Sequence, residues 1–115
     1  MNPKELKDYC LSKSGAVEDF PFGPDVIVIK AGGKMFALIS QRDNKLNLSL
    51  KCDPFLAQEF RQRYSSITPG YHMSKKNWNT IVVDDSIPEE ELFWMINHSY
   101  DLVLKSLPKS ARESL

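Results

Sequence analysis

The side chains best suited to bind a ligand are gathered between Pro69 and Ile81, where the chain reads PGYHMSKKNWNTI. Lys75 and Lys76 provide two ammonium groups for a phosphate, and His72 provides a titratable hydrogen-bond donor. Trp78 provides an indole face on which a nucleobase can stack. These four residues therefore predict a site for nucleic acid or another polyanion.

The same segment also admits a structural interpretation. Trp78 can fill the seam between a sheet and a helix with Tyr71 beside it, while His72 hydrogen-bonds to a backbone carbonyl and the lysines point into solvent. We favour the structural role for Trp78 and leave both roles open for His72. The paired lysines are the stronger candidates for ligand contact.

Two bases outside this segment, Lys51 and Arg61, are further candidates for the anion site. Lys51 precedes a predicted helix that Asp53 caps, so the simpler interpretation is that both residues anchor a strand-to-helix corner. Arg61 and Arg63 point in different directions from their helix, because residues two apart do not share a face. At most one of these arginines can therefore join the paired lysines.

No combination of residues predicts catalysis. No motif links His72 to a cysteine or serine, so a nucleophile with its base and orienting group is not indicated. Cys10 and Cys52 lack the CxxC spacing of metal and redox sites, and we expect two reduced thiols. His72 and His98 fall on different predicted elements without metal-ligand spacing. We expect a protein that is not an enzyme and that uses neither a metal nor a cofactor.

Length and composition describe one globular domain spanning residues 1–115. A chain of 115 residues can bury a single core, and 42% hydrophobic with 26% charged residues is typical of soluble proteins. No apolar run approaches the roughly 20 residues of a membrane span, and the N-terminus lacks the apolar segment of a secretory signal. We therefore expect a cytoplasmic location without membrane contact.

Charge is distributed unevenly along the chain, although the formal net charge is zero. A zero net charge argues against nucleic-acid binding through the overall field of the protein. Between Arg42 and Lys76, however, seven bases outnumber three acids, and six acids without a base follow between Asp84 and Asp101. The bases of this central segment are Arg42, Lys45, Lys51, Arg61, Arg63, Lys75 and Lys76.

Capping residues and hydrophobic periodicity predict an α+β fold. Asn2, Pro3 and Glu5 begin a helix that ends near Lys13. The pair Gly32-Gly33 predicts the first turn of a three-stranded antiparallel meander, and the alternation in LNLSL marks its third strand. The other expected elements are an ordered loop from Gly15 to Pro24 with its phenylalanines packed over a sheet edge, strands at 26–31, 35–40 and 46–50, a helix from Pro54 to Tyr64, a strand from Trp78 to Val83 with a short partner at 71–73, and a helix from Pro88 to Leu107 followed by a short tail.

We expect the helices to cover mainly one face of this sheet. The alternation in LNLSL and the helical spacing of apolar residues in the last helix motivate this expectation. Tyr100 lies on the apolar stripe of that helix, so we expect it to be buried with its hydroxyl group hydrogen-bonded. The expected core also contains Phe36, Leu38, Leu48, Phe60, Trp78, Ile81 and Val83.

Three motifs make the chain resemble the MmcQ/YjbR family over nearly its whole length. They are LKCDP at Leu50 to Pro54, PGYHMSKKNWNT at Pro69 to Thr80, and HSYDLVLKSLPK at His98 to Lys109. Lys75 stands beside the expected Lys76, so either lysine can be the functional base. The family-like positions are Lys51, Asp53, Pro54, Pro69, His72, Lys76, Trp78, Ser99 and Tyr100.

The resemblance implies a compact fold with the order α-β-β-β-α-β-β-α, similar to the type III secretion chaperones and described as CyaY-like. Members of the family are commonly described as candidate DNA-binding proteins, so the resemblance also implies contact with nucleic acid. The leading hypothesis is a non-enzymatic cytoplasmic domain that binds nucleic acid or another polyanion through its basic central segment. The alternative is a protein-interaction or chaperone-like module that uses a sheet or helix face, although a shared fold alone does not establish a shared function.

Overall fold

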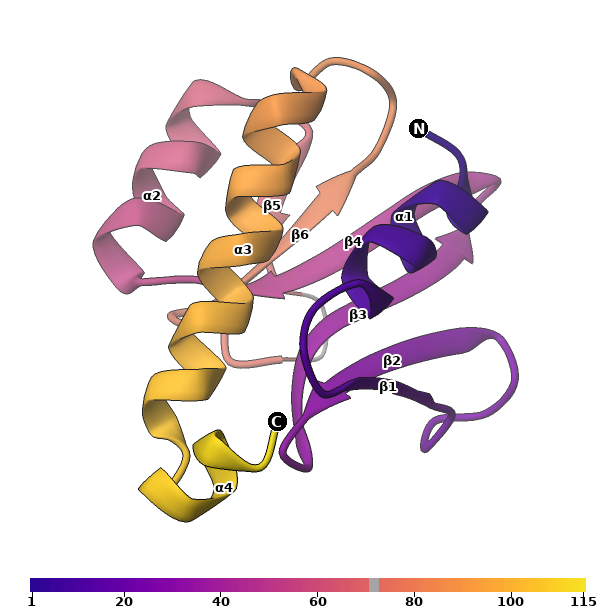
Figure 1. Ribbon diagram of the computed structural model, residues 1–115. Helices are drawn as coiled ribbons and strands as arrows, with labels where there is room; N and C mark the ends of the chain where they lie inside the picture. Colours follow the sequence, from indigo (N-terminus) through magenta and orange to yellow (C-terminus); the bar gives the residue numbers. More distant parts are fainter. Residues whose placement is uncertain (71–72) are drawn as a thin grey trace.

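Residues 1–70 and 73–115 of the chain are described by a computed structural model (Figure 1). A helix and four strands are followed by a second helix, two further strands, a long helix and a short one. The elements are α1 (Pro3–Leu11), β1 (Ala16–Asp19), β2 (Val26–Ala31), β3 (Lys34–Arg42), β4 (Lys45–Lys51), α2 (Pro54–Arg63), β5 (Ile67–Pro69), β6 (Trp78–Val82), α3 (Glu89–Ser106) and α4 (Lys109–Glu113).

Within the described residues, the strands form one six-stranded antiparallel sheet in the order β1-β2-β3-β4-β6-β5. Helices α1 and α3 lie on the same side of this sheet (Figure 1). Helix α2 joins them there, because the Asn79 side chain on this side of β6 donates to Ala57 O at 3.3 Å. We call this side the helix-covered face and the opposite side the open face. The predicted α+β architecture is confirmed.

The helices begin where the sequence places them. In α1, Asn2 Oδ1 accepts a hydrogen bond from Glu5 N at 2.8 Å, and Asn2 N donates to Glu5 Oε1 at 3.3 Å, which completes a capping box. In α2, Asp53 Oδ2 accepts hydrogen bonds from Phe55 N and Leu56 N, both at 3.1 Å. Across the described ranges, no helix has the length and apolar character needed to cross a membrane.

The meander is also confirmed, but two local predictions around it are wrong. The segment expected as a loop contains the edge strand β1, and Phe20 and Phe22 remain 45% and 60% exposed, because β1 itself pairs with the edge they were expected to cover. The strand beside β6 is β5 at Ile67–Pro69, whereas Met73 belongs to no strand. Only Ile67 is buried in β5, so the strand leaves little hydrophobic pattern. The predicted residues Tyr71 and His72 lie outside the described ranges.

The register of the sheet assigns each side chain to a face, since directly paired residues point to the same side. Leu48 pairs with Ile39 on β3 and with Ile81 on β6, and all three are buried on the helix-covered face. Side chains alternate between the two faces along a strand. Leu38 is one residue from Ile39 and Trp78 is three residues from Ile81, so both point to the open face. The predicted burial of Trp78 is confirmed at 8% exposure, but Trp78 and Leu38 lie outside the main core cluster, which contains Phe36, Leu48, Phe60 and Ile81 and against which Val83 packs.

Phe36 reaches the core because β3 contains a β-bulge. Ile29 is opposite Ala37 and Lys30 is opposite Met35, so Phe36 is the extra residue without a partner on β2. The bulge allows both Phe36 and Ala37 to be fully buried. The Phe36 ring packs against the ring of Tyr100 in a T-shaped arrangement, with the centroids 5.3 Å apart.

Helix α3 is fastened to the sheet through two consecutive side chains. Continuing the β3–β4 register by one pair would place Phe36 opposite Lys51. Ser99 bridges this position: Lys51 N donates to Ser99 Oγ at 2.9 Å, and Ser99 Oγ donates to Phe36 O at 2.6 Å. The next residue, Tyr100, is buried and donates its hydroxyl proton to Ser14 O at 2.6 Å, as predicted.

Replacing Ser99 with alanine tests this bridge. Because the buried Lys51 N–H and Phe36 carbonyl would both lose their partner, Ser99→Ala should lower the free energy of unfolding by about 1–3 kcal/mol in urea denaturation. The matched control is Ser106→Ala, since Ser106 is exposed on the same helix and donates to Val103 O in its own preceding turn. We expect the control to change stability by less than about 0.5 kcal/mol. Equal effects of the two substitutions would contradict the bridging role.

Candidate functional site

The predicted ligand-binding residues that the structure describes meet where β4 ends and β6 begins. Lys51 is directly paired with Trp78, and both point to the open face. Lys75 and Lys76 are exposed in the turn of residues 74–77, which Trp78 N closes by donating to Ser74 O at 3.0 Å. Cys52 N donates to Asn77 O at 2.7 Å and holds the end of β4 beside this turn. His72 lies outside the described residues.

Trp78 is buried, although it lies outside the central core. Its side chain is only 8% exposed, and a Cβ atom at Gly70 would come within 2.7 Å of Trp78 Cβ. The absence of a side chain at Gly70 therefore lets the two backbones approach, and Gly70 N donates to Trp78 O at 2.8 Å. A ring enclosed in this way supports the local packing and leaves little indole surface for stacking a base.

Arg61 directs its guanidinium group to protein oxygens. Arg61 Nε donates to Asn79 Oδ1 at 2.6 Å, and Nη2 donates to Trp78 O at 3.2 Å and also to Lys75 O. These bonds join α2 to the turn that carries the paired lysines. Arg61 therefore positions the turn, whereas its neighbour Arg63 points elsewhere and pairs with Glu91 at 2.8 Å.

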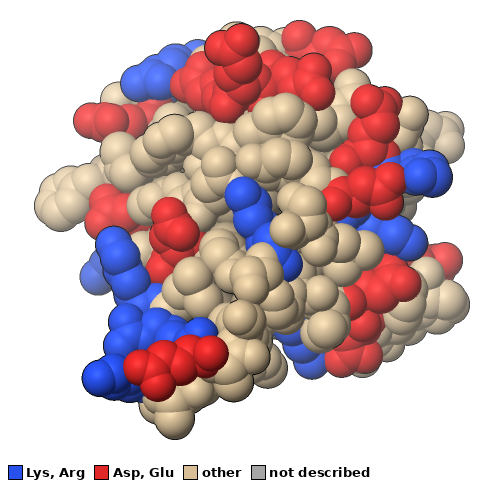
Figure 2. Space-filling view, viewed as in Figure 1, with Lys and Arg blue, Asp and Glu red and all other residues tan. Residues whose placement is uncertain are grey.

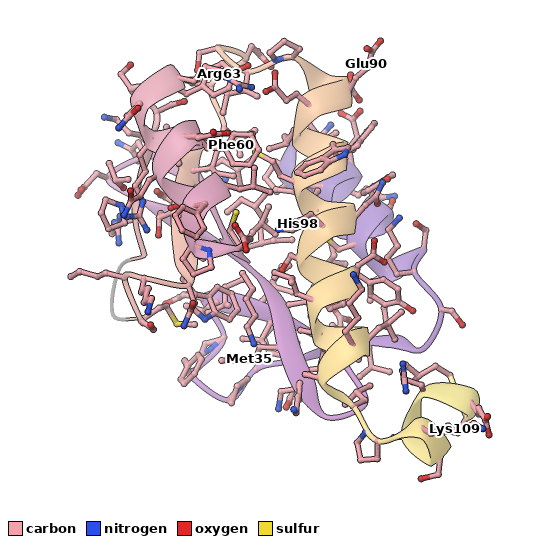
Figure 3. The ribbon with its side chains drawn as sticks, turned by 90° about the vertical axis from the view of Figure 1, so that its left-hand side faces the viewer. Met35, Phe60, Arg63, Glu90, His98 and Lys109 are labelled. Atoms are coloured by element: carbon pink, nitrogen blue, oxygen red, sulfur yellow. The ribbon has the colours of Figure 1, made fainter. Side chains whose placement is uncertain are left out.

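His98 belongs to the strand-to-helix corner next to Lys51. Its ring stacks on Trp94 with centroids 5.1 Å apart, in the seam between α3 and α2 where Phe60 also lies (Figure 3). Asp53 N donates to His98 Nε2 at 3.2 Å, so this nitrogen must be unprotonated. Burial lowers the pKa of His98 below its ordinary value, against the opposing effect of Asp53 and Asp101. The neutral ring therefore supports the corner.

The two cysteines are poorly suited to chemistry at neutral pH. Both are free and buried, and burial raises the pKa of Cys10 to about 12 and that of Cys52 to about 11. Each sulfur is therefore a protonated thiol rather than the reactive thiolate. Among the residues that the structure describes, no group of three histidine, cysteine, aspartate or glutamate side chains is placed to hold a metal ion.

The open face carries basic side chains at both ends of the central strands. Arg42 and Lys45 are directly paired at the β3–β4 turn, and Lys51 lies on the same face at the other end of β4. The acids of the start of α3 belong to the opposite side of the molecule. Figure 2 shows that side, where acidic side chains gather at the upper rim above the beginnings of α1 and α3. Lys and Arg side chains are also present on that side, so the acids form a local cluster at its upper rim.

A cavity of about 490 Å³ lies on the open face between these basic ends. Its apolar surface comes from strand residues such as Val26 and Leu38, together with Met73 and Phe22. Its polar surface comes mainly from side chains of the central strands. Arg42 and Asp25 line the part of the cavity nearest the β3–β4 turn. The polar side chains of the strands that line it are Ser40, Asn47, Ser49 and Thr80. We call this hollow the open-face cavity.

The lining of the open-face cavity was missed as a site by sequence reasoning, although part of its signal was present. The alternation in LNLSL placed Asn47 and Ser49 on the wet side of a strand, yet nothing in the sequence showed which residues of β3 and β6 stand beside them. That information lies in the register, where Ser49 pairs with both Leu38 and Thr80. Short polar side chains there leave a hollow.

Comparisons with known proteins place the chain among bacterial relatives. A family model described as YjbR matches residues 11–102. The uncharacterized protein YjbR of Escherichia coli K12 is 31% identical over 115 residues, which cover 100% of this chain and 98% of that protein. The uncharacterized protein YbdF of Escherichia coli O157:H7 is 42% identical over 90 residues, which cover 78% of this chain and 74% of that protein. The crystal structure of Deinococcus radiodurans protein DR2400, with the domain DUF419, superposes with a TM-score of 0.89 at 37% identity, covering 96% of this chain and 85% of that one.

The two tryptophans of the chain offer a matched test of the structural role of Trp78. Trp78→Ala should lower the free energy of unfolding by roughly 3–5 kcal/mol, because it removes a large buried ring. Trp94→Ala removes a ring that is 48% exposed and should cost only about 1–2 kcal/mol. Urea denaturation of both variants measures the difference. A smaller loss for Trp78→Ala than for Trp94→Ala would show that the indole is dispensable for packing.

His98 should make stability dependent on pH. Because the pKa of His98 is lowered by folding, the unfolded chain binds a proton more readily, and stability should fall as pH drops below about 6.5 and through the lowered folded-state value. Urea midpoints measured between pH 7 and pH 5 should therefore decline more for the wild type than for His98→Gln. Equal declines of the urea midpoint in the two proteins would exclude His98 as the source of the pH dependence.

Proposed function

This chain belongs to the YjbR family, and we propose that it is a non-enzymatic domain that binds single-stranded nucleic acid, or a similar flexible polyanion, across the open face of its sheet. The relatives carry no assigned activity in their names, so the proposal is argued from the geometry of this chain. A cytoplasmic location is part of the proposal and agrees with two free thiols.

Basic side chains lie around the open-face cavity, and their placement is the observation that supports the proposal. Lys45 and Lys51 lie on the same face of β4, six residues or about 20 Å apart along the strand. Lys75 and Lys76 are exposed in the turn next to Lys51 and add two positive charges at that end of β4. Within residues 1–70 and 73–115, Lys51, Lys75 and Lys76 make no ion pair with a carboxylate. Lys75 Nζ donates to Gly70 O at 3.3 Å, which leaves its other N–H groups for a phosphate, and within the same residues the ammonium groups of Lys51 and Lys76 are likewise not neutralised by a carboxylate.

A single strand suits this surface better than a duplex. Proteins that bind single strands combine a basic path for the backbone with sites that accept base faces. The open-face cavity lies between the two basic ends, and only unpaired bases can reach into it, since a duplex keeps its bases stacked inside. We assign the phosphates of the ligand to the lysine and arginine side chains at the two ends of the central strands. The cavity between them would accept a less polar part of the ligand.

A second candidate function, protein binding, has one specific observation in its favour. Val17, Phe20 and Phe22 are 57%, 45% and 60% exposed along and just beyond the edge strand β1. An exposed edge strand with apolar side chains can pair with an extended peptide. Such binding would depend only weakly on salt, which separates it from phosphate binding.

The paired lysines provide the test of the proposed function. Replacing both Lys75 and Lys76 with alanine should weaken the binding of a mixed-sequence single-stranded oligonucleotide. The slope of log affinity against log salt should fall by about 1.4, because each neutralised phosphate on a single strand contributes about 0.7. Fluorescence anisotropy at several salt concentrations measures both quantities, with a duplex of the same sequence as comparison.

The matched control removes the same charge from the other side of the molecule. Lys4 and Lys105 are exposed on α1 and α3, and replacing both with alanine should change the affinity and the salt slope much less. Both double variants should melt within a degree or two of the wild type, since exposed substitutions cost little. The absence of wild-type binding at low salt, or equal weakening by the two double variants, would overturn the proposal.

A further inference from the structure

We infer that the open-face cavity is the pocket for one unpaired nucleobase of the bound strand. This inference rests on the proposed function and goes beyond it, because phosphate contacts alone need no cavity. A hollow of about 490 Å³ falls within the range of small-ligand sites and has room for one base with part of its sugar.

One side chain of the open-face cavity is buried but has a polar atom without a partner in the described part of the chain. Asn47 is 4% exposed, and its Nδ2 donates to Lys45 O at 2.9 Å. Asn47 Oδ1 accepts no hydrogen bond from the described residues, and no buried side-chain polar atom among them lacks a partner. The residual exposure of Asn47 must therefore include Oδ1, and Asn47 lines the open-face cavity. A ligand with an N–H donor would complete this site.

The wall of the cavity beside Asn47 carries several hydroxyl groups. The hydroxyl groups of Ser49 and Thr80 are 3.1 Å apart, and Ser40 contributes a further hydroxyl group on the same face. Because the Ser49 and Thr80 hydroxyl groups are bonded to each other and Thr80 is only 2% exposed, the hydroxyl group of Ser40, which can both donate and accept, is the one assigned to the edge of a base. An aliphatic ligand would fill the volume but would leave Asn47 Oδ1 without a donor.

The open-face cavity also has an apolar surface beside this polar wall. Val26 and Leu38 offer a non-polar floor, and Phe22 at the rim is 60% exposed and can stack on a planar ring. An apolar surface for the ring and a polar wall for its edge describe a flat heteroaromatic molecule. Cytosine, adenine and guanine carry an exocyclic amine from which Asn47 Oδ1 would accept, whereas thymine lacks this amine and has only its ring N3–H as a donor.

Binding measured with oligomers of equal length and equal phosphate charge tests the inference. We expect oligo-dC to bind about tenfold more tightly than an abasic oligomer of the same length, with oligo-dT between them. Asn47→Leu, which keeps the approximate shape but removes the acceptor, should abolish the preference for dC over dT. Ser40→Phe should fill the cavity and bring all three oligomers to the affinity of the abasic one. Thr68→Phe is the control, because Thr68 is exposed on the open face outside the cavity.

The possible outcomes separate this inference from the proposed function. Equal binding of all three oligomers with a steep salt dependence would overturn the base pocket and leave phosphate binding intact. If the wild type binds none of the oligomers, both the base pocket and the proposed function are overturned. Competition by free dCMP at the same concentration as the oligomer would assign the cavity to a mononucleotide and overturn the strand-bound base. Thermal melts of each variant show that the comparisons are made on folded protein, and Ser40→Phe and Asn47→Leu provide independent tests.

Discussion

The hydroxyl group of Ser99 is the contact on which the arrangement of the molecule depends. It lies where β3 and β4 stop pairing, accepts from Lys51 N and donates to Phe36 O. A buried peptide group without a partner is costly, so the separation of the two strands requires a group that serves both. Because Ser99 belongs to α3, the same bonds fix the helix over the centre of the sheet.

The bulge at Phe36 and the bridge by Ser99 together determine what the open face displays. With the extra residue placed on the helix-covered face, Phe36 packs against Tyr100, and Leu38, Ser40 and Arg42 follow on the open face. A shift of one residue would exchange the apolar and polar sets of side chains. The core and the surface that we propose for ligand binding are therefore consequences of one register.

The sequence predicts regular patterns well and irregular ones poorly. LNLSL predicted a strand with one wet face because its period is unambiguous, and Asp53-Pro54 predicted a helix start because both residues have a specific role there. The run MFALIS is apolar throughout, so nothing in it shows the bulge at Phe36. The placement of Trp78 failed for a related reason, since hydrophobicity predicts burial but not the face of the sheet. The acceptors of Arg61 are carbonyl groups and an amide brought together only by the fold, and no side-chain pattern encodes them.

The bonds of Arg61 also bear on the thermodynamics of ligand binding. A turn with two exposed lysines would ordinarily sample many backbone conformations and would lose that freedom on contact with a ligand. Here α2 holds the carbonyl groups of Lys75 and Trp78, so the backbone is ordered when the chain folds. The conformational entropy still to be lost on binding is largely that of the lysine side chains. Weakening α2 would therefore reduce affinity at a distance, through disorder of the turn rather than through loss of charge.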